Sequence, residues 1–183
     1  MKEVLFGLLL LCSPCILLQA EDQGVLYQED FTGFSAEGWE LEGGWQVVAD
    51  NGDAVLRGAG HQWARYRRYL AADTRLAFRL KLERGAIHLV YRMGQEGRYF
   101  ISFSAEGSSL HKQYWPDTFL DLPARSSSSY EPGRWHRVEI VGEGDTLSLI
   151  VDGRTEWRYT DREALRGSTF AFESLDDCVA QID

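Results

Sequence analysis

The segment 133–159 constrains the fold more than any other part of the chain. Two stretches in it, 137–141 and 146–151, alternate apolar with polar side chains. A period of two is typical of half-buried antiparallel strands. Asp152-Gly153 is a pair favoured in type I′ turns, so a further strand is expected at 154–159. The segment therefore predicts a three-stranded meander.

Most of the remaining chain has the same strand pattern. The clearest alternation, 74–82, places four apolar side chains on one face and polar or small ones on the other. Further strands are predicted at 25–31, 45–48, 54–57, 86–92, 99–104, 110–115, 168–174 and 179–183, with a hairpin turn at 50–53. Only 161–166 hints at a helix, with Asp161 as its N-cap. Many short strands predict an all-β fold in which two antiparallel sheets pack as a sandwich.

The stretch 116–134 breaks this alternation. It contains three of the four prolines and the run Ser126-Ser-Ser-Ser129. Such a composition predicts a long loop, which either crosses between the sheets or borders a binding face.

The first 20 residues are typical of a secretory signal peptide, with cleavage expected after Ala20. Pro14 interrupts the apolar run, which is shorter than the roughly 20 residues of a membrane-spanning helix. We therefore expect a secreted, periplasmic or extracellular β-sandwich domain at 21–183. A membrane contact would require an uncleaved or lipidated signal. Lipidation of Cys12 or Cys15 is disfavoured, because a lipoprotein signal has a small residue before the modified cysteine and Leu11 and Pro14 stand there. The last residues, 180–183, favour a strand cut short, and hence a domain truncated at its C-terminus or leading a longer protein.

The charge and cysteine content exclude several classes of partner and stabilisation. The formal net charge is −9, which argues against nucleic acid and anionic lipid as partners. After cleavage Cys178 is the one remaining cysteine, so the domain would have no internal disulfide. A neutral or cationic ligand fits this balance best.

Signatures of hydrolytic and metal chemistry are weak in this sequence. The four histidines share no zinc-ligand spacing, and no G-x-S-x-G nucleophile motif occurs. Glycoside hydrolysis needs two facing carboxyl groups, and no E-x-D-x-x-E strand is present. Glu139 and Glu173 each stand alone in their strands and are interpreted as outward, solvated carboxylates. The catalytic residues, if there are any, are therefore not predicted.

Calcium is an alternative rather than the expectation. Glu29, Asp30 and Asp183 would come together if the first and last strands paired, and they offer hard oxygen ligands. The acidic cluster at 50–53 is more simply a hairpin turn. No metal ligand or other cofactor is therefore predicted.

Strand parity groups polar and aromatic side chains on one outward face. If Ile87, Leu89 and Tyr91 face the core, the side chains between them face the opposite way. Sugar recognition uses apolar rings for stacking and fork-shaped donors for hydroxyl groups or a carboxylate. We predict that a carbohydrate ligand binds on a face that carries Arg79, His88, Arg92, Ser102 and Trp115. The alternative is an ordinary solvent-facing sheet surface, which is normally polar.

From Glu29 to Asp183 several short motifs carry a family resemblance. They are E-D-F at 29–31, G-A-I-H-L-V-Y-R at 85–92, G-R-W-H-R-V-E-I at 133–140, V-D-G at 151–153 and F-A-F-E-S at 170–174. The chain resembles the concanavalin A-like, or laminin-G-like, jelly-roll superfamily, and within it the bacterial domains related to family 16 glycoside hydrolases, or 3-keto-disaccharide hydrolase-like domains. The resemblance implies a jelly roll. Its motifs fall on turns and core positions, so no catalytic residue is carried over.

Three functions follow from the resemblance and the predicted face. The first is a secreted, non-catalytic carbohydrate-binding or adhesion module. The second is a glycoside hydrolase or 3-keto-disaccharide hydrolase-like enzyme that uses Glu139, Glu173 or an acid of 116–134. The third is a structural or protein-interaction domain, which would be favoured if 116–134 covered the predicted face.

Overall fold

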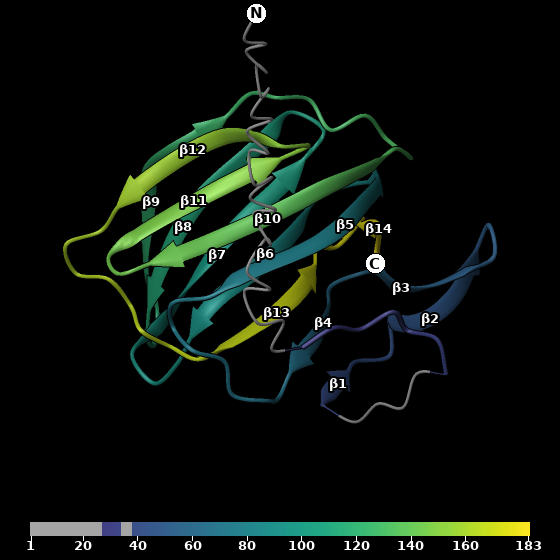
Figure 1. Ribbon diagram of the computed structural model, residues 1–183, viewed down its shortest axis with the longest axis horizontal. Coiled ribbons are helices and arrows are strands. Elements are labelled where there is room, and N and C mark those ends of the chain that lie inside the picture. The colour runs from purple at the N-terminus through teal and green to yellow at the C-terminus, as the bar shows by residue number, and fades with distance from the viewer. Residues whose placement is uncertain (1–26, 34–37) are drawn as a thin grey trace, which may run out of the picture.

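The computed structural model describes residues 27–33 and 38–183, and these form a sandwich of two antiparallel sheets (Figure 1). Sheet I has the order β1 (Trp39–Leu41), β4 (Gln62–Tyr66), β13 (Thr169–Ser174), β6 (Ile87–Met93), β7 (Gly97–Ser104), β8 (Gly107–Tyr114) and β9 (Thr118–Ser126). Sheet II has the order β12 (Arg154–Thr160), β11 (Thr146–Val151), β10 (Trp135–Glu143), β5 (Arg75–Arg84), β14 (Val179–Ile182), β3 (Asp53–Ala59) and β2 (Trp45–Asp50). The predicted all-β, two-sheet antiparallel sandwich is confirmed.

The core lies between the two sheets and is built by alternation along each strand. Leu80 and Ile140 of sheet II and Leu89 and Ile101 of sheet I are almost completely buried. Toward the β1 end aromatic rings take over, and Phe172 lies 5.1 Å from Phe78 in an edge-to-face contact, measured between ring centroids. Burial of this apolar surface is the main force that holds the sheets together.

The predicted meander and its turns are confirmed. β10, β11 and β12 pair in sequence order. Asp152 and Gly153 have φ values of 49° and 77°, and Asn51 and Gly52 have values of 53° and 100°. Type I′ turns require positive φ at both central residues, and glycine meets this requirement without steric cost.

Several local predictions are wrong. The stretch 116–134 contains a full strand, β9, because Pro123 is tolerated on a sheet edge where its missing N–H faces away from a partner. Residues 27–31 form no strand, and the last strand, β14, lies between β5 and β3 instead of beside a first strand. The stretch 161–166 is not helical, because the Asp161 carboxylate caps a tight turn at the backbone N–H of Glu163.

The predicted signal peptide, 1–20, lies outside the described residues. Among the residues that the structure does describe, no helix is long and apolar enough to cross a membrane.

A buried ion pair explains the polar residue that interrupts the inner face of β8. Lys112 is 2% exposed, and its Nζ donates to Asp161 Oδ2 at 2.8 Å and to the Glu163 carbonyl at 2.6 Å. Tyr99 Oη donates to the same carboxylate oxygen at 2.6 Å. Burial by itself would lower the pKa of Lys112 and raise that of Asp161, but their hydrogen bonds shift both pKa values the other way. The pair is therefore charged and anchors the turn after β12 to sheet I.

We predict that Asp161→Ala destabilises the domain by about 3–5 kcal/mol, because it leaves the Lys112 ammonium buried without a counter-charge. Urea unfolding followed by tryptophan fluorescence measures the change. The double variant Lys112→Met with Asp161→Ala should recover part of the loss, since it removes the stranded charge. Equal stability of the single and double variants would contradict this account.

Candidate functional site

A carboxylate in the middle of sheet I organises the outer face of that sheet. Glu173 lies on β13, with Trp63 of β4 and His88 of β6 as its cross-strand partners. Its side chain is only 8% exposed. His88 Nδ1 lies 3.2 Å from Oε2, Arg98 Nη1 donates to the same oxygen at 3.3 Å, and His61 Nε2 lies 3.3 Å from Oε1. Three side chains from three other places in the chain therefore converge on one buried carboxylate.

The electrostatics of this cluster keep the carboxylate ionised. Burial acts to raise the pKa of Glu173, but the hydrogen bond of His88 and the charge of Arg98 hold that pKa below its usual value. The hydrogen bond to Glu173 raises the pKa of His61, and the exposed Asp176, at 3.2 Å from His61 Nδ1, adds to the shift. Arg98 and Glu173 thus form a charge-neutral centre.

Arg98 lies among aromatic rings. Its guanidinium carbon lies 4.9 Å from the ring centroid of Trp63, 5.3 Å from that of Phe100 and 5.8 Å from that of Trp115. These distances are within the range of cation–π attraction. Its Nε donates to Gln113 Oε1 at 2.7 Å. The side chain is therefore held in one orientation by a carboxylate, an amide and three rings.

An aromatic row continues from this centre toward β9. The Phe100 ring stacks on His111 at 4.8 Å between centroids and contacts His88 at the same distance. Phe119 meets Phe100 edge-on at 6.5 Å. Trp115 and Phe119 are 41% and 59% exposed, so two aromatic rings present free surface beside the polar centre. We call this surface the Glu173 face, defined by His61, Trp63, His88, Arg98, Phe100, His111, Gln113, Trp115, Phe119 and Glu173.

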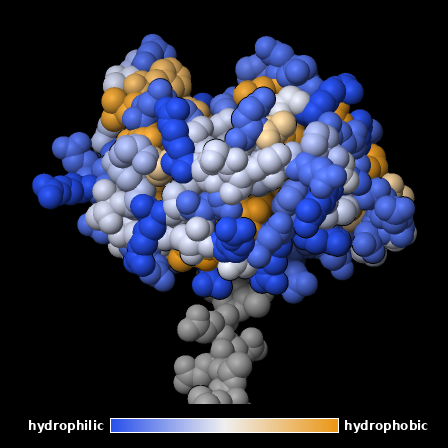
Figure 2. Space-filling model, turned by 90° about the horizontal axis from the view of Figure 1, so that it is seen from above, coloured by the Kyte–Doolittle hydropathy of each residue, from blue (hydrophilic) through white to orange (hydrophobic). Residues whose placement is uncertain are grey.

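The molecular outline is hollowed on the side of sheet I (Figure 2). Sheet I lies behind sheet II in Figure 1, and Figure 2 views the molecule from above. The upper side in Figure 2, which is the side of sheet I, is hollowed between two lobes. Concave surfaces with a few convergent polar groups are where ligands preferentially bind.

Three of the five predicted site residues share this outer surface. His88 and Ser102 are cross-strand partners on β6 and β7, and Trp115 directly follows β8. Arg79 does not join them, because it lies on β5 of sheet II, where it pairs with Asp183 and lies over the Trp135 ring. Strand parity predicts the face of a strand but not the sheet to which the strand belongs.

The prediction for Arg92 is wrong. Its φ of 49° breaks the alternation of β6, and the side chain turns inward until it is 2% exposed. Its Nε donates to the Ala72 carbonyl at 2.8 Å, and its Nη2 donates to Asp73 at 3.0 Å. A Cβ at Gly142 would approach this guanidinium to 2.7 Å, so the glycine makes room for it. Arg92 therefore forms a structural ion pair with Asp73.

Arg98, His61 and Trp63 were not predicted as site residues from the sequence. The strand predicted at 99–104 begins two residues earlier, at Gly97, and that extension includes Arg98. Parity from Phe100 would then have placed Arg98 on the same face. The alternation in β4 was also present in the sequence as Q-W-A-R-Y, but flanking glycines and arginines obscured it. Glu173 was noted but interpreted as solvated, and its three partners show it to be buried.

The other acidic residues considered for catalysis or calcium binding, Glu139, Asp183 and Glu29, already have partners of their own. Glu139 lies in sheet II, where Arg75 and Arg137 hold it, so it does not face Glu173. Asp183 lies against Arg79, while Glu29 accepts hydrogen bonds from Tyr27 Oη and the Phe31 N–H. Within 27–33 and 38–183, no group of three His, Cys, Asp or Glu side chains is arranged to hold a metal ion.

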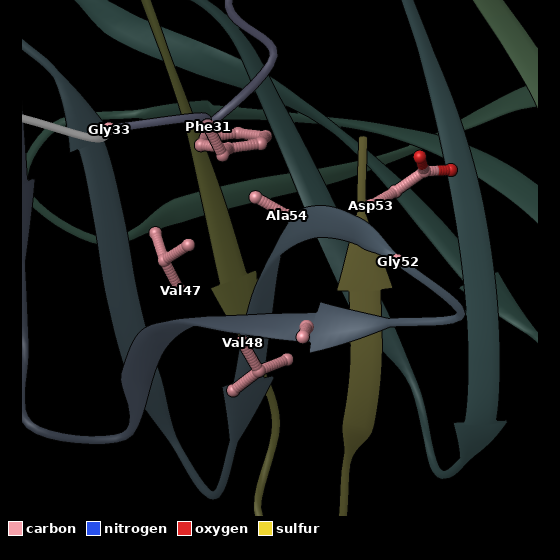
Figure 3. A pocket seen from close by; sticks show the side chains of 8 residues that line it. Phe31, Gly33, Val47, Val48, Gly52, Asp53 and Ala54 are labelled. Atoms are coloured by element: carbon pink, nitrogen blue, oxygen red, sulfur yellow. The ribbon is translucent and has the colours of Figure 1, made fainter.

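A shallow hollow near the β2–β3 hairpin is a weaker candidate (Figure 3). Phe31, Val47, Val48 and Ala54 contribute its apolar wall, and Asp53 is the one titratable side chain in its lining. Asp53 already lies 3.5 Å from Arg79 Nη2. The hollow lies at the edge of sheet II and offers little chemistry beyond that ion pair.

Solved structures with the same architecture establish the fold class. A family 66 carbohydrate-binding module from Bacillus subtilis superposes with a TM-score of 0.61 at 15% identity, covering 80% of this chain and 92% of that one. A family 16 glycoside hydrolase from Bacteroides ovatus, in complex with a G4G4G3G product, gives 0.65 at 11% identity over 86% and 98%. A β-glucanase from Bacillus licheniformis gives 0.62 at 9% identity over 84% and 93%. The chain has a concanavalin A-like jelly-roll fold, similar to the folds of these three structures.

Comparison of the sequence itself with protein-family profiles and with curated proteins found no match.

We predict that Arg92→Ala lowers the free energy of unfolding by about 3 kcal/mol, because it removes a buried charge pair and leaves a void beside Gly142. Arg154→Ala, at an exposed position of β12, is the matched control and should change stability by less than about 0.5 kcal/mol. Thermal and denaturant unfolding measure both. A variant at Arg92 as stable as the control would restore this residue as a candidate for ligand contact.

We predict that Glu173→Gln costs about 2 kcal/mol at pH 7, because hydrogen bonds to a charged carboxylate are replaced by weaker ones. The folded pKa of Glu173 is depressed, so its contribution is present above the unfolded value of about 4.5 and is lost as the pH falls through the folded value. The stability gap between parent and variant should therefore narrow below about pH 4.5. Unfolding from pH 3 to pH 7 tests this, with the exposed Glu131→Gln as control. A gap independent of pH would contradict it.

Proposed function

We propose that this domain is a secreted, non-catalytic carbohydrate-binding module whose ligand binds the Glu173 face. One observation carries the proposal: exposed Trp115 and Phe119 rings adjoin a fixed network of hydrogen-bonding groups on the outer face of sheet I. Sugars present an apolar ring face and a rim of hydroxyl groups, and this surface offers a partner for each.

The polar centre suits hydroxyl recognition because its orientation is set before a ligand arrives. Arg98 is held by Glu173 and Gln113, and His88 is held by Glu173 and the Phe100 ring. Preorganised donors lose little conformational entropy on binding. Carbohydrates bind weakly unless such costs are low, since their hydroxyl groups must give up water.

The electrostatics of the face favour binding over hydrolysis. Glycoside hydrolases pair a protonated carboxylic acid with a second carboxylate. Glu173 has a lowered pKa, which is the opposite of what a general acid requires. The nearest linked acid in the described chain, Asp176, reaches Glu173 only through His61 and is 92% exposed.

The fold neighbours support a carbohydrate ligand in general terms. One is named a carbohydrate-binding module, and another is a glycoside hydrolase captured with an oligosaccharide product. At sequence identities of 15% and 11%, these neighbours show a shared fold but do not show a shared ligand. The proposal therefore rests on the side chains of the Glu173 face.

Hydrolysis is the second candidate, because His61 contacts both Glu173 and Asp176 and so brings two acids to one imidazole ring. A protein-interaction role for this face is less favoured. Coverage of the face by 116–134 would have favoured that role, whereas β9, within this stretch, extends the sheet at its edge.

The first experiment measures retardation of the mature domain in native gels that contain one polysaccharide each. The neutral panel is mixed-linkage β-glucan, laminarin and levan, and the acidic panel is pectate and chondroitin sulfate. We expect retardation by at least one neutral polymer without release of reducing sugar. Reducing sugar that disappears in Glu173→Gln would favour the hydrolase, and no retardation by any polymer would contradict the proposal.

We predict that Trp115→Ala weakens binding of the retarding polymer by about two- to twelvefold, since one ring stacking contact is worth about 0.5–1.5 kcal/mol. Tyr69→Ala is the matched control, because Tyr69 is an 81% exposed aromatic residue of the connection between β4 and β5 and is not one of the residues that define the Glu173 face. Affinity gels quantify both variants, and circular dichroism verifies their folds. Equal affinity of the Trp115 variant and the parent would remove this ring from the site.

A further inference from the structure

We propose that the Glu173 face binds an internal stretch of a neutral polysaccharide chain, running across six strands, and not a terminal sugar. The inference rests on the proposed function and deepens it by naming the ligand class. It is carried by three features of the described residues: the length of the outward row, the position of aromatic rings along it, and the pairing of its charges.

The outward side chains form continuous rows from β4 to β9. In one row the cross-strand partners are Trp63, Glu173, His88, Ser102 and Ser109. In the adjacent row they are Arg65, Ala171, Val90, Phe100, His111 and Asp121. Strands are about 4.8 Å apart, so five intervals span about 24 Å. This length exceeds what a single sugar ring can cover.

Aromatic rings occur along the whole of this span. Trp63 lies on β4, Phe100 lies on β7, and Phe119 lies on β9. Phe119 is 59% exposed and is separated from Glu173 by three intervening strands. A site for one terminal sugar would be complete around Glu173 and would gain nothing from an exposed ring on the edge strand. Phe100 is only 9% exposed and stacks on His111, so the rings open to a ligand are Trp63, Trp115 and Phe119. A chain with a repeated apolar ring face can stack on each of these three rings.

The charges of the face cancel in pairs. On the face itself Arg98 pairs with Glu173 at 3.3 Å. Arginines that flank the face on β4 and β9 or just after β4 are also paired: Arg65 with Glu42 at 2.8 Å, Arg67 with Glu40 at 3.0 Å and Arg125 with Asp121 at 3.7 Å. A uronate or sulfate group would have to displace one of these carboxylates, and the net charge of −9 would oppose its approach. The face therefore favours an uncharged chain.

The experiment measures affinity against chain length by isothermal titration calorimetry. The probes are size-fractionated partial acid hydrolysates of mixed-linkage β-glucan, laminarin and levan, from disaccharide to octasaccharide, each with its reducing end converted to the alditol. We expect affinity for the oligomers of the retarding polymer to rise at least tenfold from disaccharide to hexasaccharide and then level off. A tenfold gain corresponds to about 1.4 kcal/mol.

Phe119→Ala separately tests the β9 end of the outward rows. It should lower the affinity for the hexasaccharide several-fold and leave the affinity for the disaccharide unchanged. Leu120→Ala is the matched control, because Leu120 is also exposed on β9 but pairs with Lys112, whose side chain faces inward, so it belongs to the other face of the strand. It should change neither affinity.

The outcomes separate this inference from the proposed function. A disaccharide that binds as tightly as the hexasaccharide would overturn the inference and leave the carbohydrate-binding function standing. An effect of Phe119→Ala on disaccharide and hexasaccharide alike would also overturn it. Preferential binding of pectate or chondroitin sulfate would overturn the neutral-chain element. No binding of any polymer or oligomer would overturn the proposed function and the inference together.

Discussion

The alternation of Phe172 and Glu173 on β13 is the constraint on which the rest of the structure depends. Phe172 anchors the strand in the core, where its ring meets those of Trp45 and Phe78. The next side chain must then point outward, in the middle of a seven-stranded sheet. A lone carboxylate there is shielded from water on both sides, so it needs donors from neighbouring strands. The candidate site is thus a consequence of how the sandwich is packed.

Most of the fold could be predicted because period-two patterns report one buried face directly. The meander, the β2–β3 hairpin and the long strand β5 were recovered in this way. β9 was missed because Pro123 and a serine run indicate a loop, and only its place at the sheet edge makes the proline acceptable. Pairing partners far apart in the sequence, such as β14 between β5 and β3, follow from packing of the whole domain.

The candidate site was less predictable because a charged residue in a strand has two possible environments. Arg92 and Arg98 stand six positions apart, and both are at most 9% exposed. Arg92 enters the core because a positive φ turns it there, whereas Arg98 stays on the outer face under a cover of rings. Neither the backbone twist nor the aromatic cover has a local sequence signature. His88 and Ser102 were found because parity holds along β6 as far as Tyr91 and along β7, and Trp115 was found because it directly follows β8.

A binding face and a carboxylic-acid active site of the same fold differ in the proton affinity of their carboxyl groups. Catalysis by carboxylic acids needs one group whose pKa is raised, which an apolar, donor-poor environment provides. On the Glu173 face two histidines and one arginine approach the same carboxylate and lower its pKa instead. Such a group accepts hydrogen bonds at all physiological pH values but has no proton to give. The arrangement is therefore better suited to holding hydroxyl groups in place than to breaking the bond between two sugars.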